Sequence, residues 1–345
     1  MIRWLRREKT PPPHAVPNPP RAETATPNAE HILRRLEWSV LRRLDGLLLG
    51  DYRTLMRGAG LDLADLREYQ MHDDVRHIDW NVTARMQTPH VRVFTEDREM
   101  AAWFLLDLSP SVDFGSGPQR KRQVSAEFVA VLARLLTRHG NRVGALLYAA
   151  GVEKMIPARA SRQHVLHLLH AMQSVQPAAT TKKEAARARQ SSAGGTKLSE
   201  LLLAAANTIR RRSTIFVVSD FISEPGWEKP LGQLATRHEV VAVRLTDPLE
   251  LALPDLGLLT LRDAETGEQL LVDTHSPAFR RRFAAIAAQR EAELRGSLAR
   301  AGVDTLELST DDDLASAIVR FTDLRRQRAR LAAGGGMPAH LRKTA

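Results

Sequence analysis

The chain has 345 residues, 43% of them hydrophobic and none of them cysteine, so it can bury a sizeable core but has no disulfide, thiolate metal site or cysteine nucleophile. Most of its net charge of +10 lies at the two ends, because residues 51–320 hold 35 basic and 34 acidic side chains. We therefore do not expect the folded body to bind nucleic acid, and nucleic-acid binding by the basic termini is the alternative. No apolar stretch approaches the ~20 residues that span a bilayer, and the charged, proline-rich start lacks a secretory signal, so we expect a cytoplasmic protein without a transmembrane segment.

The first hundred residues divide into three predicted parts. Residues 1–30 are rich in proline and are expected to form a disordered tail. Residues 31–49 have the apolar spacing of an amphipathic helix, which we expect to pack on its own domain, with contact to a membrane surface as the alternative. Residues 50–99 are dense in glycine, aspartate, arginine and aromatic residues, and a small β-rich subdomain is predicted there.

Strand and helix patterns alternate from residue 100 to residue 332. A buried apolar strand ends at Asp107, and further apolar strands are predicted at 142–149, 214–219 and 240–245. Helices are predicted between them, and two short strands at 258–262 and 269–273 read as a hairpin. The expected fold class is α/β, a Rossmann-like domain with a mostly parallel sheet and helices on both faces, followed by a flexible tail at 333–345.

Oxygen-bearing side chains follow two of the predicted strands. Asp107, Ser109 and Ser111 come directly after the first apolar strand, where ligands bind in an open α/β sheet. One carboxylate and two hydroxyls suit a hard cation, Mg²⁺ or Mn²⁺, and Thr196 and Asp220 are placed to complete such a site. Serine and aspartate are also common in turns and helix caps, so the prediction depends on all five residues acting as a set.

Residues 63–85 form a second cluster, in which acids alternate with arginines. One interpretation is a metal-dependent hydrolase or nuclease that uses Asp73, Asp74 and Asp79. We favour a structural or contact surface in which Arg67, Asp79 and Arg85 are largely ion-paired around Trp80. Neither a phosphate-binding Gly-x-x-x-x-Gly-Lys-Ser/Thr loop nor a Gly-x-Ser-x-Gly elbow occurs in the sequence, so an ATPase or serine hydrolase is not expected.

These two clusters resemble those of known families. The first resembles the metal-ion-dependent adhesion site (MIDAS) of von Willebrand factor A domains, which implies one Mg²⁺ surrounded by Asp107, Ser109, Ser111, Thr196 and Asp220. The second resembles the signature of the bacterial DUF58 family, whose members contain a von Willebrand factor A-like domain. The signature residues that carry this resemblance are Arg67, Glu68, Tyr69, Asp73, Asp74, Arg76, Asp79, Trp80 and Arg85.

The resemblance implies a function as well as a fold. It implies a non-enzymatic, metal-dependent protein-interaction module that acts as an adaptor for a MoxR-type AAA+ ATPase. Such a pair would act in chaperone-like assembly or maturation of protein complexes, with a client protein offering a carboxylate to the metal. Mg²⁺ held by hydroxyls and few carboxylates keeps residual positive charge, which attracts such a carboxylate.

Overall fold

The computed structural model describes residues 29–41, 44, 65–70, 75, 78–93, 101–175, 196–262 and 269–332. Residues 1–28 of the tail expected at 1–30, and all of the tail expected at 333–345, lie outside these residues. The division of the chain into the five predicted segments therefore stays a prediction.

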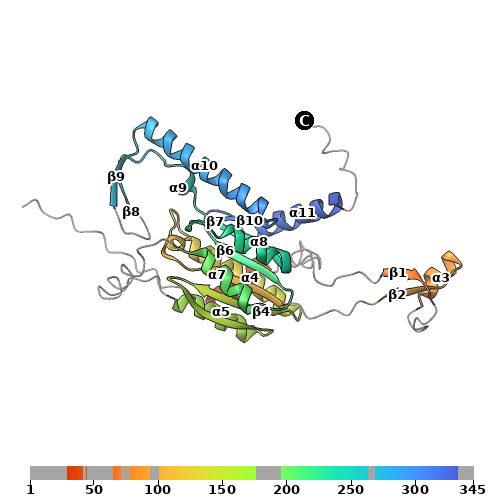
Figure 1. Cartoon of the computed structure of the whole chain (residues 1–345). Helices are drawn as coiled ribbons and strands as arrows, with labels where there is room; N and C mark the ends of the chain where they lie inside the picture. The colour runs from red at the N-terminus through yellow and green to blue at the C-terminus, as the bar shows by residue number, and fades with distance from the viewer. Residues whose placement is uncertain are drawn as a thin grey trace, which may run out of the picture.

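A six-stranded sheet forms the centre of the molecule (Figure 1). Its strands are β3 (Ala101–Asp107), β4 (Arg142–Tyr148), β5 (Val152–Arg159), β6 (Thr214–Ser219), β7 (Glu239–Thr246) and β10 (Asp304–Ser309). They lie in the order β10-β7-β6-β3-β4-β5, and all neighbouring pairs are parallel except β4 with β5. This arrangement confirms the expected α/β class with a mostly parallel sheet.

The strand sequences explain their positions in the sheet. β3 and β6 are nearly continuous apolar runs, and both are central strands covered on two faces. β5 is one of the two edge strands, and it exposes charged residues such as Glu153 and Lys154, which discourage pairing with another chain.

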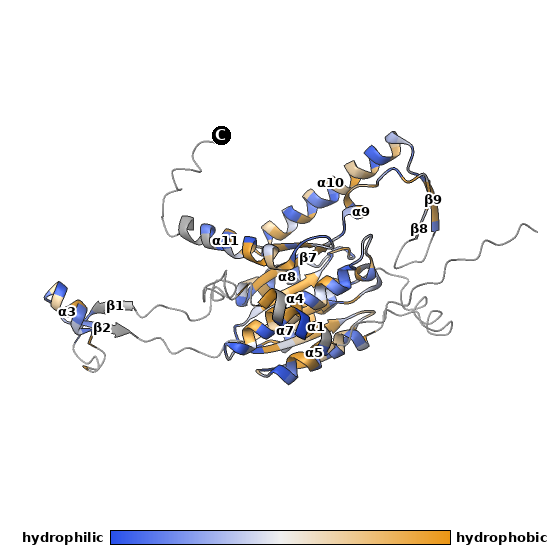
Figure 2. Ribbon diagram, turned by 180° about the vertical axis from the view of Figure 1, so that it is seen from behind, coloured by the Kyte–Doolittle hydropathy of each residue, from blue (hydrophilic) through white to orange (hydrophobic). Residues whose placement is uncertain are grey.

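Helices cover both faces of the sheet. One face packs against α1 (Ala29–Leu36), α4 (Lys121–Arg138), α5 (Arg162–Ser174) and α11 (Leu314–Ala332). The other packs against α7 (Leu198–Thr208), α8 (Glu228–Arg237) and the C-terminal part of α10 (Pro277–Arg300). Figure 2 shows hydrophobic residues concentrated on the strands and hydrophilic residues along the outer helices. Each face of the sheet therefore has its own apolar core.

The N-terminal helix is part of this body. Helix α1 continues into η1 (Glu37–Leu41), a single turn of π-helix, and it begins two residues before the predicted segment 31–49, of which residues 42–43 and 45–49 lie outside the described part of the chain. Leu33 and Leu44 are fully buried in the core that contains α4 and α5, and the Arg134 Nε donates to the Glu37 carboxylate at 2.6 Å. Packing on its own domain, rather than contact with a membrane surface, explains the apolar stripe.

Two smaller elements lie outside the main sheet. The signature unit consists of β1 (Asp65–Glu68), α3 (Trp80–Met86) and β2 (His90–Val93), with β1 and β2 antiparallel. After β7 the chain forms the short helix α9 (Pro248–Leu251) and the antiparallel hairpin of β8 (Leu258–Arg262) and β9 (Gln269–Asp273). None of the helices described is long and apolar enough to cross a membrane.

Candidate metal and partner site at the carboxyl edge

The centre of the sheet contains a topological switch point. β3 is paired with β4 on one side and with β6 on the other, and the helices that follow β3 and precede β6 lie on opposite faces. In open α/β sheets the crevice outside the carboxyl ends of such strands is where ligands bind. Asp107 ends β3, and Asp220 directly follows β6, so both acids lie at this crevice.

The turn after β3 places Asp107, Ser109 and Ser111 together. The Asp107 Oδ1 accepts from the Ser109 backbone N–H at 3.0 Å, which closes a tight turn, and Ser111 is the second residue of the short 3₁₀ helix η4 (Pro110–Asp113). The Ser109 and Ser111 hydroxyl oxygens are 3.1 Å apart, and all three residues are buried. Three oxygen-bearing side chains thus share one small buried volume.

The Asp107 carboxylate also bridges to the neighbouring strand. The register pairs Leu106 with Val218, so Asp107 and Ser219 end their strands at the same level, and the Ser219 hydroxyl donates to the Asp107 Oδ2 at 2.6 Å. Burial, and next the nearby negative charge of Asp220, raise the pKa of Asp107 to about 6, although hydrogen bonds from Ser219 and Ser109 oppose this shift. A buried acid beside a second acid is an environment that favours a positive partner.

The turn after β6 has an unusual backbone. Phe221 has φ of 59°, in the left-handed region that a bulky residue rarely adopts, and such strain costs on the order of 1–3 kcal/mol. The turn is held by two hydrogen bonds, from the Phe221 N–H to the Ser219 hydroxyl at 2.9 Å and from the Ile222 N–H to the Asp220 Oδ1 at 3.0 Å. The Phe221 ring packs on Trp227, with the ring centroids 5.4 Å apart. The turn that carries Asp220 is therefore held in a strained backbone conformation by these hydrogen bonds and by ring packing.

Thr196 reaches the same edge from the loop before α7. Its carbonyl oxygen accepts from the Ser223 hydroxyl at 2.7 Å and from the Glu224 N–H at 2.8 Å, which ties it to the turn that carries Asp220. The N–H of Lys197, the residue after Thr196, donates to the Tyr148 hydroxyl, and this hydrogen bond connects the loop to the end of β4. Five residues predicted from the sequence are thus brought to one edge of the sheet.

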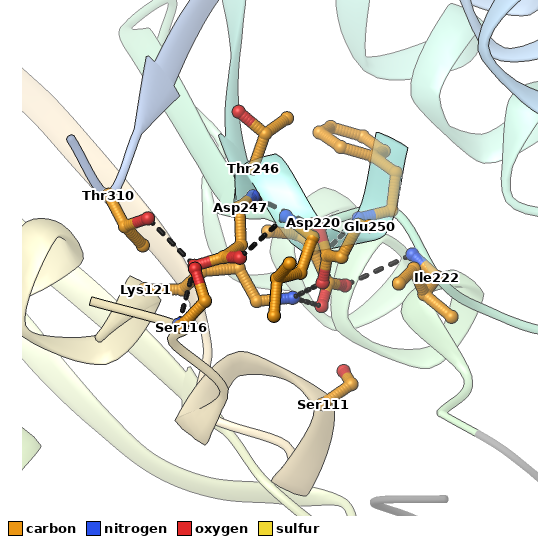
Figure 3. A network of polar contacts seen from close by, with 12 residues as sticks. Ser111, Ser116, Lys121, Asp220, Ile222, Thr246, Asp247, Glu250 and Thr310 are labelled. Carbon is orange, nitrogen blue, oxygen red and sulfur yellow. Dashed lines mark hydrogen bonds and ion pairs between the residues drawn. The ribbon is translucent and has the colours of Figure 1, made fainter. Parts of the chain in front are cut away.

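Lys121 belongs to the cluster and was not anticipated from the sequence. It lies in the first turn of α4, its side chain has no exposed surface, and its Nζ donates to the Asp220 Oδ2 at 2.7 Å and to the Glu250 Oε1 at 2.6 Å (Figure 3). Burial alone would lower the pKa of Lys121, but the charges of Asp220 and Glu250 outweigh it and raise this pKa above its ordinary value. The edge therefore holds a permanent ammonium group.

Asp247 connects this cluster to the last strand of the sheet. Its Oδ2 accepts from the Ser116 N–H at 2.9 Å and from the Thr310 hydroxyl at 2.8 Å, and its Oδ1 accepts from the Leu249 N–H at 3.0 Å (Figure 3). Glu250 in turn accepts from the Asp247 N–H at 3.2 Å, which completes a capping box on α9. The segments after β3, β7 and β10 are thereby linked through one buried carboxylate.

The donor set fits a hard divalent cation. Adjacent ligands of octahedral Mg²⁺, each at 2.0–2.1 Å from the metal, lie about 3.0 Å apart, close to the 3.1 Å between the Ser109 and Ser111 hydroxyl oxygens. Among the described residues, no three His, Cys, Asp or Glu side chains come together as a metal-binding group, so the hydroxyl oxygens would have to supply part of the coordination. Asp107 and Asp220 would supply the negative charge.

Asp79 of the signature unit has a structural role at the start of a helix. The Asp79 Oδ1 accepts from the Asn81 and Val82 N–H groups at 3.0 and 3.2 Å, so its carboxylate caps α3, as an aspartate directly before a helix often does. Trp80 is 69% exposed rather than central to a network, and Arg85 is exposed in the last turn of α3.

The remaining signature residues are only partly described. Glu68 ends β1 opposite His90, and Tyr69 is half-buried, with its N–H donating to the Pro89 carbonyl at 2.8 Å. Arg67 lies in β1, but its side chain, together with all of Asp73, Asp74 and Arg76, lies outside the described residues. The capping contacts of Asp79 count against the hydrolase interpretation, and Asp73 and Asp74 lie outside the described residues.

Several known proteins are similar to this chain. The family described as "Protein of unknown function DUF58" matches residues 65–293. Uncharacterized proteins of Mycobacterium tuberculosis and Mycobacterium bovis are 37% identical to it over 320 residues, covering 91% of this chain and 96% of theirs.

Solved structures give more distant similarities. An aerotolerance-related membrane protein of Bacteroides fragilis has a TM-score of 0.41 at 14% identity, with 66% of this chain and 99% of that chain covered. The conserved hypothetical protein BatB of Bacteroides thetaiotaomicron has a TM-score of 0.40 at 13% identity, with the same coverage. A von Willebrand factor type A structure from Catenulispora acidiphila has a TM-score of 0.32 at 12% identity, covering 66% of this chain and 42% of that chain.

The strand order, the antiparallel edge strand β5, and the acids and hydroxyls at the switch point together define an open α/β domain whose candidate site lies at the carboxyl edge of a mostly parallel sheet. The chain belongs to the DUF58 family.

Proposed function

We propose that this chain is a non-enzymatic, metal-dependent protein-interaction module. The observation that supports the proposal is the cluster of Asp107, Ser109 and Ser111 beside Asp220 at the switch point, where a hard cation would face the crevice. Mg²⁺ is the cation proposed, with Mn²⁺ as a substitute. When bound, the cation supplies an electrophilic point at which an acidic side chain of a partner completes the coordination.

The partner proposed is a MoxR-type AAA+ ATPase, and the client is a protein that offers a carboxylate. This part rests on the resemblance of the signature residues and on the absence of a phosphate-binding loop from the sequence. A chain without such a loop would depend on an ATPase to drive assembly or maturation of a protein complex.

The test is a titration of the purified MoxR-type ATPase of the same organism against the full chain, with Mg²⁺ and with EDTA. Asp107→Asn keeps the size of the side chain but removes its charge, and it should weaken Mg²⁺-dependent binding as strongly as EDTA does in the unaltered chain. Asp113→Asn is the matched control, because Asp113 lies in η4 of the same loop but is paired with Arg120 and half-exposed. Equal binding in EDTA and Mg²⁺ would refute the metal dependence, and no binding in either would refute the choice of partner.

The second candidate function is a metal-dependent hydrolase or nuclease, now reduced to Asp73 and Asp74. It predicts turnover of a phosphodiester or peptide substrate that is lost in Asp73→Asn and Asp74→Asn and retained in Asp107→Asn. The capping role of Asp79 favours the interaction module over this alternative.

A further inference from the structure

The Lys121 ion pair has a direct bearing on the candidate metal site. Both oxygens of Asp220 already have partners, since Oδ1 accepts from the Ile222 N–H at 3.0 Å and Oδ2 from the Lys121 Nζ at 2.7 Å. Asp107 likewise has a partner on each oxygen. The hydroxyl oxygens of Ser109 and Ser111 are hydrogen-bonded to each other.

The charges at this edge are not balanced by the lysine alone. Asp107, Asp220 and Glu250 carry three negative charges when ionised, Asp247 in the same cluster carries a fourth, and Lys121 supplies one positive charge. A divalent cation would offset most of the remaining negative charge, but it would have to bind beside an ammonium that cannot move into solvent, because the Lys121 side chain is completely buried. Two cations a few ångströms apart in a buried site repel each other strongly.

We propose that Lys121 sets the affinity of this site for a divalent cation, keeping it so weak that the metal is retained only when a partner carboxylate completes its coordination. Lys121 is a positioning residue in this account, because it acts through Asp220. Its pairing with Glu250 on α9 keeps the ammonium at this place whether or not metal is bound. The inference rests on the proposed function and adds to it the reason why metal and partner would bind together.

The variants are chosen from the charges of Lys121 and of the two acids paired with it, Asp220 and Glu250. Lys121→Met alone would leave two acids without a counter-ion at a buried position and could fail to fold. The informative comparison is therefore between Glu250→Gln, which keeps the Lys121–Asp220 pair, and the double variant Lys121→Met with Glu250→Gln. These two proteins differ only in the ammonium group. Near-ultraviolet circular dichroism and thermal unfolding establish that both are folded.

The experiment measures Mn²⁺ binding to the full-length chain by electron paramagnetic resonance. The double variant should bind Mn²⁺ at least about tenfold more tightly than Glu250→Gln, because a buried like charge has been removed. Its midpoint of thermal unfolding should also rise more on adding Mn²⁺. Equal or weaker binding by a folded double variant would overturn the role of Lys121 but leave the proposed metal site intact.

A second measurement keeps the lysine in place. If Lys121 already neutralises Asp220, then Asp220→Asn should lower the affinity for Mn²⁺ several-fold less than Asp107→Asn does. Equal losses from the two substitutions would overturn the inference. A chain that binds no Mn²⁺ in any of these forms would refute the metal site itself, so the two failures are distinguishable.

Discussion

Replacing Asp247 by asparagine tests whether one buried carboxylate holds the carboxyl edge together. Asp247 accepts three hydrogen bonds, from Ser116, Thr310 and Leu249, at 2.8 to 3.0 Å. Asparagine keeps one carbonyl oxygen, which can still accept from Ser116 and Thr310. Its amide then faces the Leu249 N–H, so two donors oppose each other and the cap on α9 is lost.

The expected loss follows from these contacts. A hydrogen bond to a charged group contributes about 1.5–3 kcal/mol, so losing one of them and leaving one N–H without an acceptor should lower the free energy of unfolding by about 2–3 kcal/mol. For a domain of 150–250 residues this corresponds to a decrease of about 4–12 °C in Tm. Denaturant unfolding at neutral pH, followed by far-ultraviolet circular dichroism, measures the difference. Asp255→Asn is the control, because the exposed ion pairs of Asp255 with His275 and Arg280 should change the free energy of unfolding far less.

The same variant gives a pH signature. Burial would raise the pKa of Asp247, but the hydrogen bonds from Ser116, Thr310 and Leu249 outweigh it and lower this pKa below 3.8 in the folded chain. A lowered pKa stabilises the folded state above the unfolded-state pKa of about 3.9, and this stabilisation is lost as the pH falls through the folded-state value. The difference between the two proteins should therefore be constant from pH 7 to about pH 5 and narrow below about pH 4. A difference under about 0.5 kcal/mol at neutral pH, or one that persists unchanged into acid, would refute the reasoning.

Two further predictions concern the apolar cores. A Cβ added at Gly144 of β4 would lie 2.8 Å from two ring carbons of Trp103 on β3, so Gly144→Ala should cost about 1–3 kcal/mol in denaturant unfolding. The same substitution should cost less in a Trp103→Leu background, and a cost near zero in the unaltered background would show that the ring moves aside freely. Leu33→Ala should lower the free energy of unfolding by about 2–5 kcal/mol, because Leu33 is fully buried in the core that contains α4 and α5. A change of less than about 0.5 kcal/mol would show that α1 does not pack there.

Much of the fold was predictable because local patterns and tertiary environment agree. The run at 101–106 is apolar throughout and ends in an aspartate, and it forms the central strand β3. The predicted strands at 258–262 and 269–273 coincide with β8 and β9, since alternating apolar residues flank a turn sequence. The five oxygen-bearing residues could be grouped because parallel strands place their carboxyl ends on one edge.

The parts that were missed depend on contacts between residues far apart in the sequence. Lys121 contacts Asp220, which is 99 residues away, and no spacing rule links them. A signal was nevertheless present, because a lysine in the first turn of a helix opposes the helix dipole and needs a compensating acid. The helix-capping role of Asp79 was also not predicted, although an aspartate directly before a helix is a strong capping signal. The left-handed backbone conformation of Phe221 could not be predicted from local sequence preferences, because phenylalanine disfavours that conformation.

The chain enters β3 at the end of the sheet opposite to Asp107. Seven residues link Val93 of β2 to Ala101 of β3, and a linker of that length can extend at most about 29 Å. The signature unit is therefore joined to the sheet at the amino end of β3, whereas the acidic and hydroxyl cluster lies at the carboxyl end, about 20 Å away along the strand. Figure 1 shows the β1–β2 unit on one side of the sheet and the β8–β9 hairpin on the other. The exposed Trp80 and the carboxyl edge thus belong to separate surfaces, so a protein bound at one of them need not cover the other.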